Sequence, residues 1–385
     1  MRAFDFFQQV SILQLPGHLL SELWTTYILQ LAQQNDAIFC ATTALSSLHE
    51  WHAGGPKAQL GNLQVLAFRQ YSRAVGFLTD VRQPPSEEAV LISCYLLTCF
   101  EALCGDHAAA SSHIASGIHL STQTGANAAA AAMPCPEIHH FKKLMRRQFS
   151  LLDLAAGFTA LSWKPPTTSL AFGNRHASVT WAPLTTHLPV DLPQPSPFLF
   201  SSVENAIVAL QNIIHDILTY KSLEKSLVHG RTMDSQLDEK REMLHTHIST
   251  WQRRLGQSFP ITSYEFEFNQ RIHFLLLISF KMIITIHDAS CTNERAADKL
   301  LPVFEAIVTT ARKLIRPSQS SHMVRRNFSM ELGIVPALYL TGTKCRDQNT
   351  RKQALELLSS ANRREWTWDS LDAAKELQRM MQLDE

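Results

Sequence analysis

The stretch FSMELGIVPALYLTGTKCRDQNTRKQALELLSSANRREWTW, Phe328 to Trp368, decides the fold of this chain. Pro336 can begin or kink a helix, and the apolar run that follows it ends at Gly342. Residues 344–347 then turn the chain. The carboxylate of Asp347 is placed to accept hydrogen bonds from the free amides of a new helix. The pattern predicts two antiparallel helices joined by this turn.

The second of these helices has one apolar side and one charged side, which is typical of a helix packed against a partner. Its apolar side carries three residues, Ala354, Leu355 and Leu358. Arg351 and Lys352 are expected to face water. We therefore expect Leu355 and Leu358 to be buried against the segment around 336–340.

Apolar residues recur at helical spacing through the rest of the chain, and no stretch alternates long enough to indicate a strand. The expected helices cover about 19–31, 36–48, 63–78, 87–103, 106–122, 137–154, 201–228, 235–256, 264–288, 293–316, 329–342, 347–360 and 367–382. Asp36, Ser86 and Asp106 are predicted N-caps, and Gly105 a helix end.

Seven prolines between Trp163 and Pro197 exclude long regular elements there. A long irregular segment of this kind is often functional, and it is the best internal boundary. The prediction is therefore an all-α fold, a large array of antiparallel helical hairpins with one proline-rich irregular segment. Its parts are an N-terminal helical half, 1–162, an irregular connection, 163–200, and a C-terminal helical half, 201–385.

Composition limits the function. The net charge of +1 gives no field that attracts nucleic acid or anionic lipid from a distance. The most apolar run, Ile272 to Ile286, contains His273 and Lys281 and is short for a bilayer span, so a buried helix and no membrane partner are expected. The seven cysteines are widely spaced, which favours free thiols in a reducing compartment.

Motifs for catalysis or metal binding are missing from the sequence. It has no G-x-S-x-G elbow, no phosphate-binding loop, no G-x-G-x-x-G and no H-E-x-x-H. Cys94, Cys99 and Cys104 are five residues apart, so they rotate around a helix and cannot converge on one metal ion. We therefore predict no catalytic residue, no cofactor and no metal site, and expect that the chain is not an enzyme.

The stretch from Phe328 to Trp368 resembles the C-terminal part of the regulatory domain of fungal zinc-cluster transcription factors. The family carries an apolar segment with a proline, a Cys-Arg-Asp turn, an Arg-x-x-Ala-Leu-x-Leu-Leu helix and a Trp segment. The matching positions are Pro336, Cys345, Arg346, Asp347, Arg351, Ala354, Leu355, Leu357, Leu358 and Trp368.

Two further stretches match the same family in order. Residues 99–120 resemble its pair of helices joined by a Gly-acidic turn, with a His and a Gly in the second helix. The matching positions here are Gly105, Asp106, His113 and Gly117. His49, near the end of an early helix, is the third match. No single match is specific, but the ordered set spans most of the chain.

The resemblance implies a nuclear fungal regulator of transcription that controls a metabolic or secondary-metabolite gene cluster. The family's zinc cluster needs six closely spaced cysteines, and this sequence has no C-x-x-C pair. Direct DNA binding by this chain alone is therefore not expected. Either a DNA-binding part lies upstream of Met1, or the chain acts through a protein partner.

Several alternatives stay open at this stage. A small-molecule effector and a homodimer are both compatible with a large helical body. The basic cluster at Lys142-Lys143 and Arg146-Arg147 is either a nuclear import signal or a solvated helix face. The competing hypothesis is a pathway protein or enzyme of secondary metabolism with an unrecognised pocket.

Overall fold

The structure is a computed structural model, and it describes residues 2–19, 22–54, 60–122, 136–161, 199–227, 234–260, 266–287, 298–315 and 327–383. Most of these residues are helical, which confirms the all-α class.

The chain forms two compact units. Among the described residues, unit 1 contains those up to 156 and 327–331, and unit 2 contains 157–161, 199–315 and 332–383. Most of the predicted proline-rich connection, 163–198, lies outside the described residues, so that division of the chain stays a prediction.

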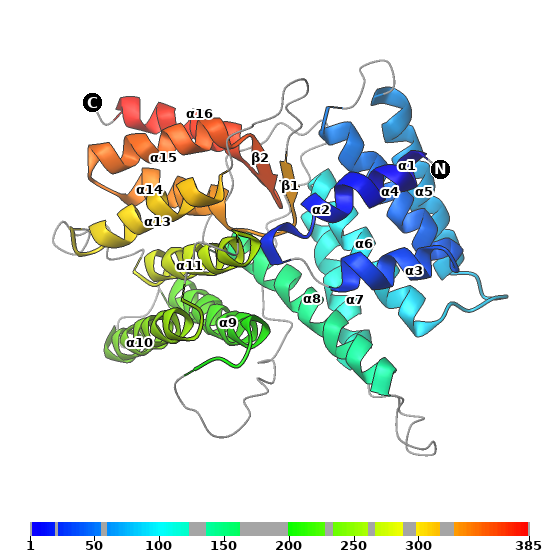
Figure 1. The fold of residues 1–385 in the computed structure, drawn as a ribbon, viewed down its shortest axis with the longest axis horizontal. Coiled ribbons are helices and arrows are strands. Elements are labelled where there is room, and N and C mark those ends of the chain that lie inside the picture. The colour runs from blue at the N-terminus through cyan, green and yellow to red at the C-terminus, as the bar shows by residue number, and fades with distance from the viewer. Residues whose placement is uncertain are drawn as a thin grey trace. The chain divides into compact units, whose positions relative to one another are not determined.

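Unit 1 is built from the helices coloured blue to green in Figure 1 and one short strand from late in the chain. Its elements are α1 (Arg2–Phe6), π-helix η1 (Phe7–Ser11), α2 (Ile12–Gln14), 3-10 helix η2 (Gly17–Leu19), π-helix η3 (Leu23–Tyr27), α3 (Ile28–Ala32), α4 (Asp36–His52), α5 (Leu60–Leu78), α6 (Glu87–Cys104), α7 (His107–Thr122), α8 (Pro136–Leu161) as far as Ala156, and β1 (Asn327–Ser329).

The helix ends of unit 1 follow the sequence signals closely. Ser86 caps α6, since its hydroxyl accepts from the amide of Ala89 at 3.2 Å. Gly105 ends the same helix in the left-handed conformation at φ 81°. The carboxylate of Asp106 accepts from the amide of Ala109 at 3.0 Å, at the start of α7. The predicted hairpin of α6 and α7 is therefore formed.

The cap of α4 differs from the prediction. Asn35, not Asp36, is the N-cap, and its amide oxygen accepts from the amides of Ala37 and Ile38 at 3.0 and 3.2 Å. Asp36 is the first helical residue, where its charge still favours the positive end of the helix dipole. Both residue types are good caps, so only the backbone conformation distinguishes them.

Unit 2 contains the helices coloured green to red in Figure 1. Its elements, after the last turn of α8, are α9 (Val203–Leu227), α10 (Asp234–Ser258), α11 (Phe266–Ile286), α13 (Leu301–Leu314), α14 (Ile334–Lys344), α15 (Gln348–Ala361), β2 (Arg363–Glu365), β3 (Trp368–Asp369) and α16 (Ser370–Leu383). Strands β2 and β3 pair antiparallel, with Glu365 opposite Trp368.

The described residues include three short strands that no alternating pattern in the sequence indicated. The predicted helix 329–342 begins only at Ile334 because residues 327–329 form β1. The predicted helix 367–382 begins only at Ser370 because Trp368 and Asp369 form β3. Strands of two or three residues are too short to show an alternating pattern. Helix α14 also continues past Gly342 to Lys344.

The core of unit 2 is centred on α14. Every residue of this helix from Ile334 to Gly342 is buried. Gly342 lies against Leu377 of α16, and a Cβ atom at Gly342 would overlap that leucine side chain. The glycine therefore allows α14 and α16 to approach closely.

Among the described helices, none combines the length and apolarity needed to cross a membrane.

Candidate functional site

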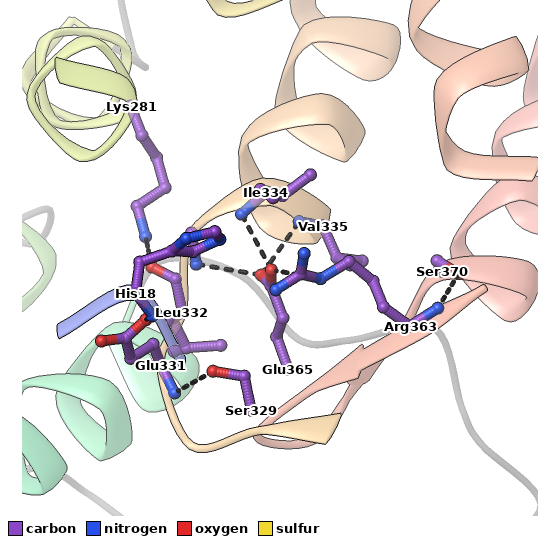
Figure 2. Close-up of polar contacts among 11 residues, drawn as sticks. His18, Lys281, Ser329, Glu331, Leu332, Ile334, Val335, Arg363, Glu365 and Ser370 are labelled. Atoms are coloured by element: carbon purple, nitrogen blue, oxygen red, sulfur yellow. Dashed lines mark hydrogen bonds and ion pairs between the residues drawn. The ribbon is translucent and has the colours of Figure 1, made fainter. Parts of the chain in front are cut away.

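The beginning of α14 carries a group of buried polar contacts (Figure 2). Gly333 is the N-cap and has no side chain to satisfy the free amides of the first turn. The carboxylate of Glu365 takes that role from β2. It accepts from the amides of Gly333, Ile334 and Val335 at 2.9, 3.1 and 3.0 Å. The next residue, Pro336, has no amide hydrogen, so the whole first turn is accounted for.

Arg363 completes this arrangement. Its Nε lies 2.9 Å from Oε1 of Glu365, whose side chain is fully buried. We call Glu365, Arg363 and the amides of residues 333–335 the Glu365 clasp. The positive end of the α14 dipole and the guanidinium both stabilise the buried carboxylate. The clasp therefore ties the β2–β3 hairpin to the start of the most buried helix of unit 2.

Lys281 of α11 lies beside the clasp and is almost fully buried, with 2% of its surface exposed. Its amine donates to the carbonyl of Leu332 at 2.7 Å and lies 4.3 Å from the centre of the Phe158 ring. Burial lowers the pKa of Lys281 from 10.5 to about 7, and the charge of Glu365 opposes that shift. Burial therefore favours the neutral form of this amine far more than for an exposed lysine.

The hairpin that carries Glu365 has an unusual turn. Trp366 has a positive φ of 51°, a conformation that bulky residues rarely adopt. The indole nitrogens of Trp366 and Trp368 and the hydroxyl of Thr367 are buried, and none of them has a hydrogen-bond partner among the described residues. The backbone strain and the unpaired polar groups both cost stability.

The Cys-Arg-Asp turn between α14 and α15 has a structural role. Asp347 caps α15 as predicted, since its carboxylate accepts from the amide and the hydroxyl of Thr350 at 2.7 and 2.8 Å. These hydrogen bonds lower the pKa of Asp347. Cys345 is buried, which raises its pKa to about 11, and Arg346 is exposed. A buried thiol with a raised pKa is a poor nucleophile.

The predicted exposure of Arg351 is wrong. It was expected to face water, but it is buried and its Nε donates to the carbonyl of Gly342 at 2.9 Å. That carbonyl lies in the last turn of α14, where carbonyls lack helical partners. Arg351 therefore joins the end of α14 to the start of α15.

The prediction that Leu355 and Leu358 are both buried is confirmed for Leu358 but not for Leu355. Ala354 and Leu358 are fully buried, while Leu355 and Leu357 are half-buried. Trp368 is also fully buried, and its ring lies 5.5 Å from that of Tyr339 on α14. These contacts place the Cys-Arg-Asp turn, α15 and Trp368 around α14, the helix that contains Pro336.

In unit 1, His49 is a fully buried histidine with both ring nitrogens engaged. Its Nδ1 lies 2.9 Å from the Ser11 hydroxyl and its Nε2 lies 3.2 Å from Oε1 of Gln14. The ring also meets the rings of Phe6 and Phe328 edge-on, with centroids 5.5 and 5.1 Å apart. His49 therefore joins α4 to the N-terminal helices and to β1.

The two remaining family positions, Gly117 and His113, lie on α7. A Cβ atom at Gly117 would overlap the ring of Phe149, so this glycine allows α7 to contact α8. The Cys94 thiol donates to the carbonyl of His113 at 3.0 Å. Burial lowers the pKa of His113 and raises that of Cys94 to about 12.

Two residues of the basic cluster on α8 have partners within unit 1. Lys142 pairs with Glu87 at 2.7 Å, and Arg146 donates to the carbonyl of Ser121 at 3.1 Å.

Sequence reasoning identified neither the Glu365 clasp nor the role of Lys281 beside it, and only Lys281 gave a signal. Lys281 stands in the most apolar run of the chain, where a charged side chain requires a partner. Glu365 gave no signal, because its amide partners lie about 30 residues earlier and the contact depends on the tertiary fold. Within the described residues, no group of three or more His, Cys, Asp or Glu side chains is placed to hold a metal ion.

Comparison with known proteins identifies the family. Residues 3–377 match the Fungal specific transcription factor domain. The chain belongs to this family. A transcription regulator of Emericella nidulans, the "Aspercryptin biosynthesis cluster-specific transcription regulator atnN", is 44% identical over 57 residues, which cover 15% of this chain and 9% of the relative. No solved structure matches the chain. The clasp, the capped turn and His49 are therefore features of a transcription-regulator domain.

Proposed function

We propose that this chain modulates transcription in the fungal nucleus and controls a metabolic or secondary-metabolite gene cluster. The family match over residues 3–377 carries the proposal. The Emericella nidulans relative is named as a regulator of a biosynthesis cluster, which supports the link to secondary metabolism; the matched stretch covers 9% of that protein.

The proposed mode of action is indirect. The chain acts through a protein partner, or through a DNA-binding part outside these 385 residues. A net charge of +1 supports the proposal that the chain alone does not bind DNA, because nucleic-acid-binding proteins usually present a basic patch. Grooves between helices are common sites for partner helices and small molecules, which leaves room for an effector and for a homodimer.

We further propose that the chain is not an enzyme. The two buried ionisable groups at the candidate site are both used within the fold. The Glu365 carboxylate accepts from three backbone amides, and the Lys281 amine donates to the carbonyl of Leu332. A general acid or base needs to reach a substrate proton, and these contacts direct both groups to the backbone instead.

Deletion of the gene tests the proposal. Transcript levels of one coherent gene set, adjacent on the chromosome in a metabolic cluster, should change, and re-introduction of the intact gene should restore them. A copy with an early stop codon serves as the matched control and should not restore them. Unchanged transcripts together with accumulation of one pathway intermediate would favour an enzyme instead.

A further inference from the structure

One face of α5 in unit 1 is apolar, uncharged and open to solvent. Val65 and Phe68 are 69% and 38% exposed, although a helix packed on a core normally turns such residues inward. Gly61, Ser72 and Gly76 are exposed as well. At 100° per residue these positions fall within one sector of the helix, opposite the buried side. That buried side carries Leu63, Ala67 and Ala74.

We call Gly61, Val65, Phe68, Ser72 and Gly76 the α5 face. Its glycines are not explained by packing within the chain, because a Cβ atom at Gly61 or Gly76 would meet nothing within 4 Å. A glycine in a helix lowers helix stability relative to alanine. It also allows another backbone to approach closely. On an exposed face, Gly61 and Gly76 would therefore allow the backbone of a binding partner to approach α5 closely.

The side chain of Phe68 is held in place from behind. Its ring meets the ring of Phe100 on α6 at right angles, with centroids 5.4 Å apart, and Tyr71 lies 4.9 Å from the same ring. Phe100 itself is 1% exposed. An aromatic side chain that is fixed by its neighbours and exposed on one side loses little entropy when a partner covers it.

The charged residues of α5 lie along one edge of the α5 face. Arg69 and Arg73 follow one edge and are exposed, and the sequence from Leu60 to Leu78 contains no other charged residue. Two positive charges therefore line an apolar stripe that has no acidic residue of its own.

We propose that the α5 face binds an acidic amphipathic helix, with apolar side chains over Val65 and Phe68 and carboxylates along Arg69 and Arg73. Such a helix matches both the apolar stripe and its charged edge. A second copy of α5 matches the stripe alone, because it brings two more arginines and no carboxylate. The inference rests on the proposed function in that it names the chemistry of a protein partner.

The test uses the full chain and a synthetic helical peptide with leucines at i, i+3, i+4 and i+7 and glutamates along one edge. Fluorescence anisotropy of the labelled peptide measures the Kd. A peptide with lysine in place of each glutamate is the charge control. The acidic peptide should bind and the basic one should not, and added salt should weaken binding.

Variants of the chain separate binding from folding. Arg69→Glu with Arg73→Glu should raise the Kd at least about tenfold, equivalent to about 1.4 kcal/mol. Arg253→Glu, an exposed arginine on α10, is the matched control and should leave the Kd unchanged. Gly76→Ala should maintain or raise the thermal midpoint, since alanine favours the helix, and should still weaken binding because its methyl group blocks close approach.

Each outcome supports or overturns the proposal. Equal binding of both peptides, or no binding of either, overturns it. A concentration-dependent dimer that the double arginine variant strengthens identifies a second copy as the occupant and also overturns it. Failure of this peptide test leaves the transcript response to gene deletion untouched, so the two proposals fail separately.

Discussion

Replacing Glu365 with alanine is the sharpest test of the structural interpretation of unit 2. The change removes the acceptor of three buried amides, at residues 333–335, and the ion-pair partner of Arg363. Each buried amide left without an acceptor costs about 1–3 kcal/mol, and water that enters the space left by the side chain recovers part of that. Breaking a buried ion pair by removing one partner typically costs about 3–5 kcal/mol. Since these effects overlap, we expect the free energy of unfolding to fall by about 3–5 kcal/mol.

The measurement is urea unfolding followed by tryptophan fluorescence and by circular dichroism, since Trp366 and Trp368 flank the clasp. Glu365→Gln keeps one carbonyl acceptor and should lose clearly less stability than Glu365→Ala. Glu376→Ala is the matched control, because it removes a partly exposed pair with Arg379 and should change stability by about 0–1 kcal/mol. If Glu365→Ala unfolds at the same urea concentration as Glu376→Ala, the clasp does not hold the start of α14.

Three further predictions follow from named contacts. Leu358→Ala should lower the free energy of unfolding by about 2–5 kcal/mol because Leu358 is fully buried. Leu355→Ala should lower it less because Leu355 is half-buried. Equal losses for the two variants in urea melts would contradict the packing of α15. The folded pKa of Lys281 is lowered from 10.5 to about 7, so the unfolded chain binds more protons between these values and stability should rise with pH across that window and stay flat below it. Lys281→Met should reduce this slope in melts at stepped pH, and an unchanged slope would refute the assignment. The purified chain should contain no stoichiometric zinc by elemental analysis and should not shift duplex DNA at moderate salt, whereas tight sequence-dependent binding would reveal an unrecognised DNA surface.

Local signals predicted the helical frame well because they depend on neighbouring residues. Ser86, Asp106 and Asp347 accept amide hydrogen bonds at the helix starts where the sequence placed them, and Gly105 ends α6. At Asn35 and Asp36 two adjacent good caps compete, and side-chain type alone does not decide between them. Propensity and periodicity therefore located elements but not every terminal residue.

Contacts between distant segments were not predictable in the same way. Arg351 was assigned to solvent from its place on an amphipathic helix, but the carbonyl of Gly342 provides it with a buried partner. Glu365 lies in a strand too short to show a pattern, and its role exists only once β2 lies beside α14. The exposed α5 face was equally hidden, since its sequence reads as an ordinary amphipathic helix until burial is known.

Tethering tests the regulatory function most directly. The chain is fused to an unrelated DNA-binding module whose sites lie upstream of a reporter gene, and reporter transcript is measured in fungal nuclei. A chain that acts on transcription through protein partners should raise or lower the transcript well beyond the module alone, and Arg69→Glu with Arg73→Glu should change that response if the partner uses the α5 face. Reporter transcript equal to that of the module alone, with the intact fusion present in the nucleus, would contradict a regulatory function for this chain.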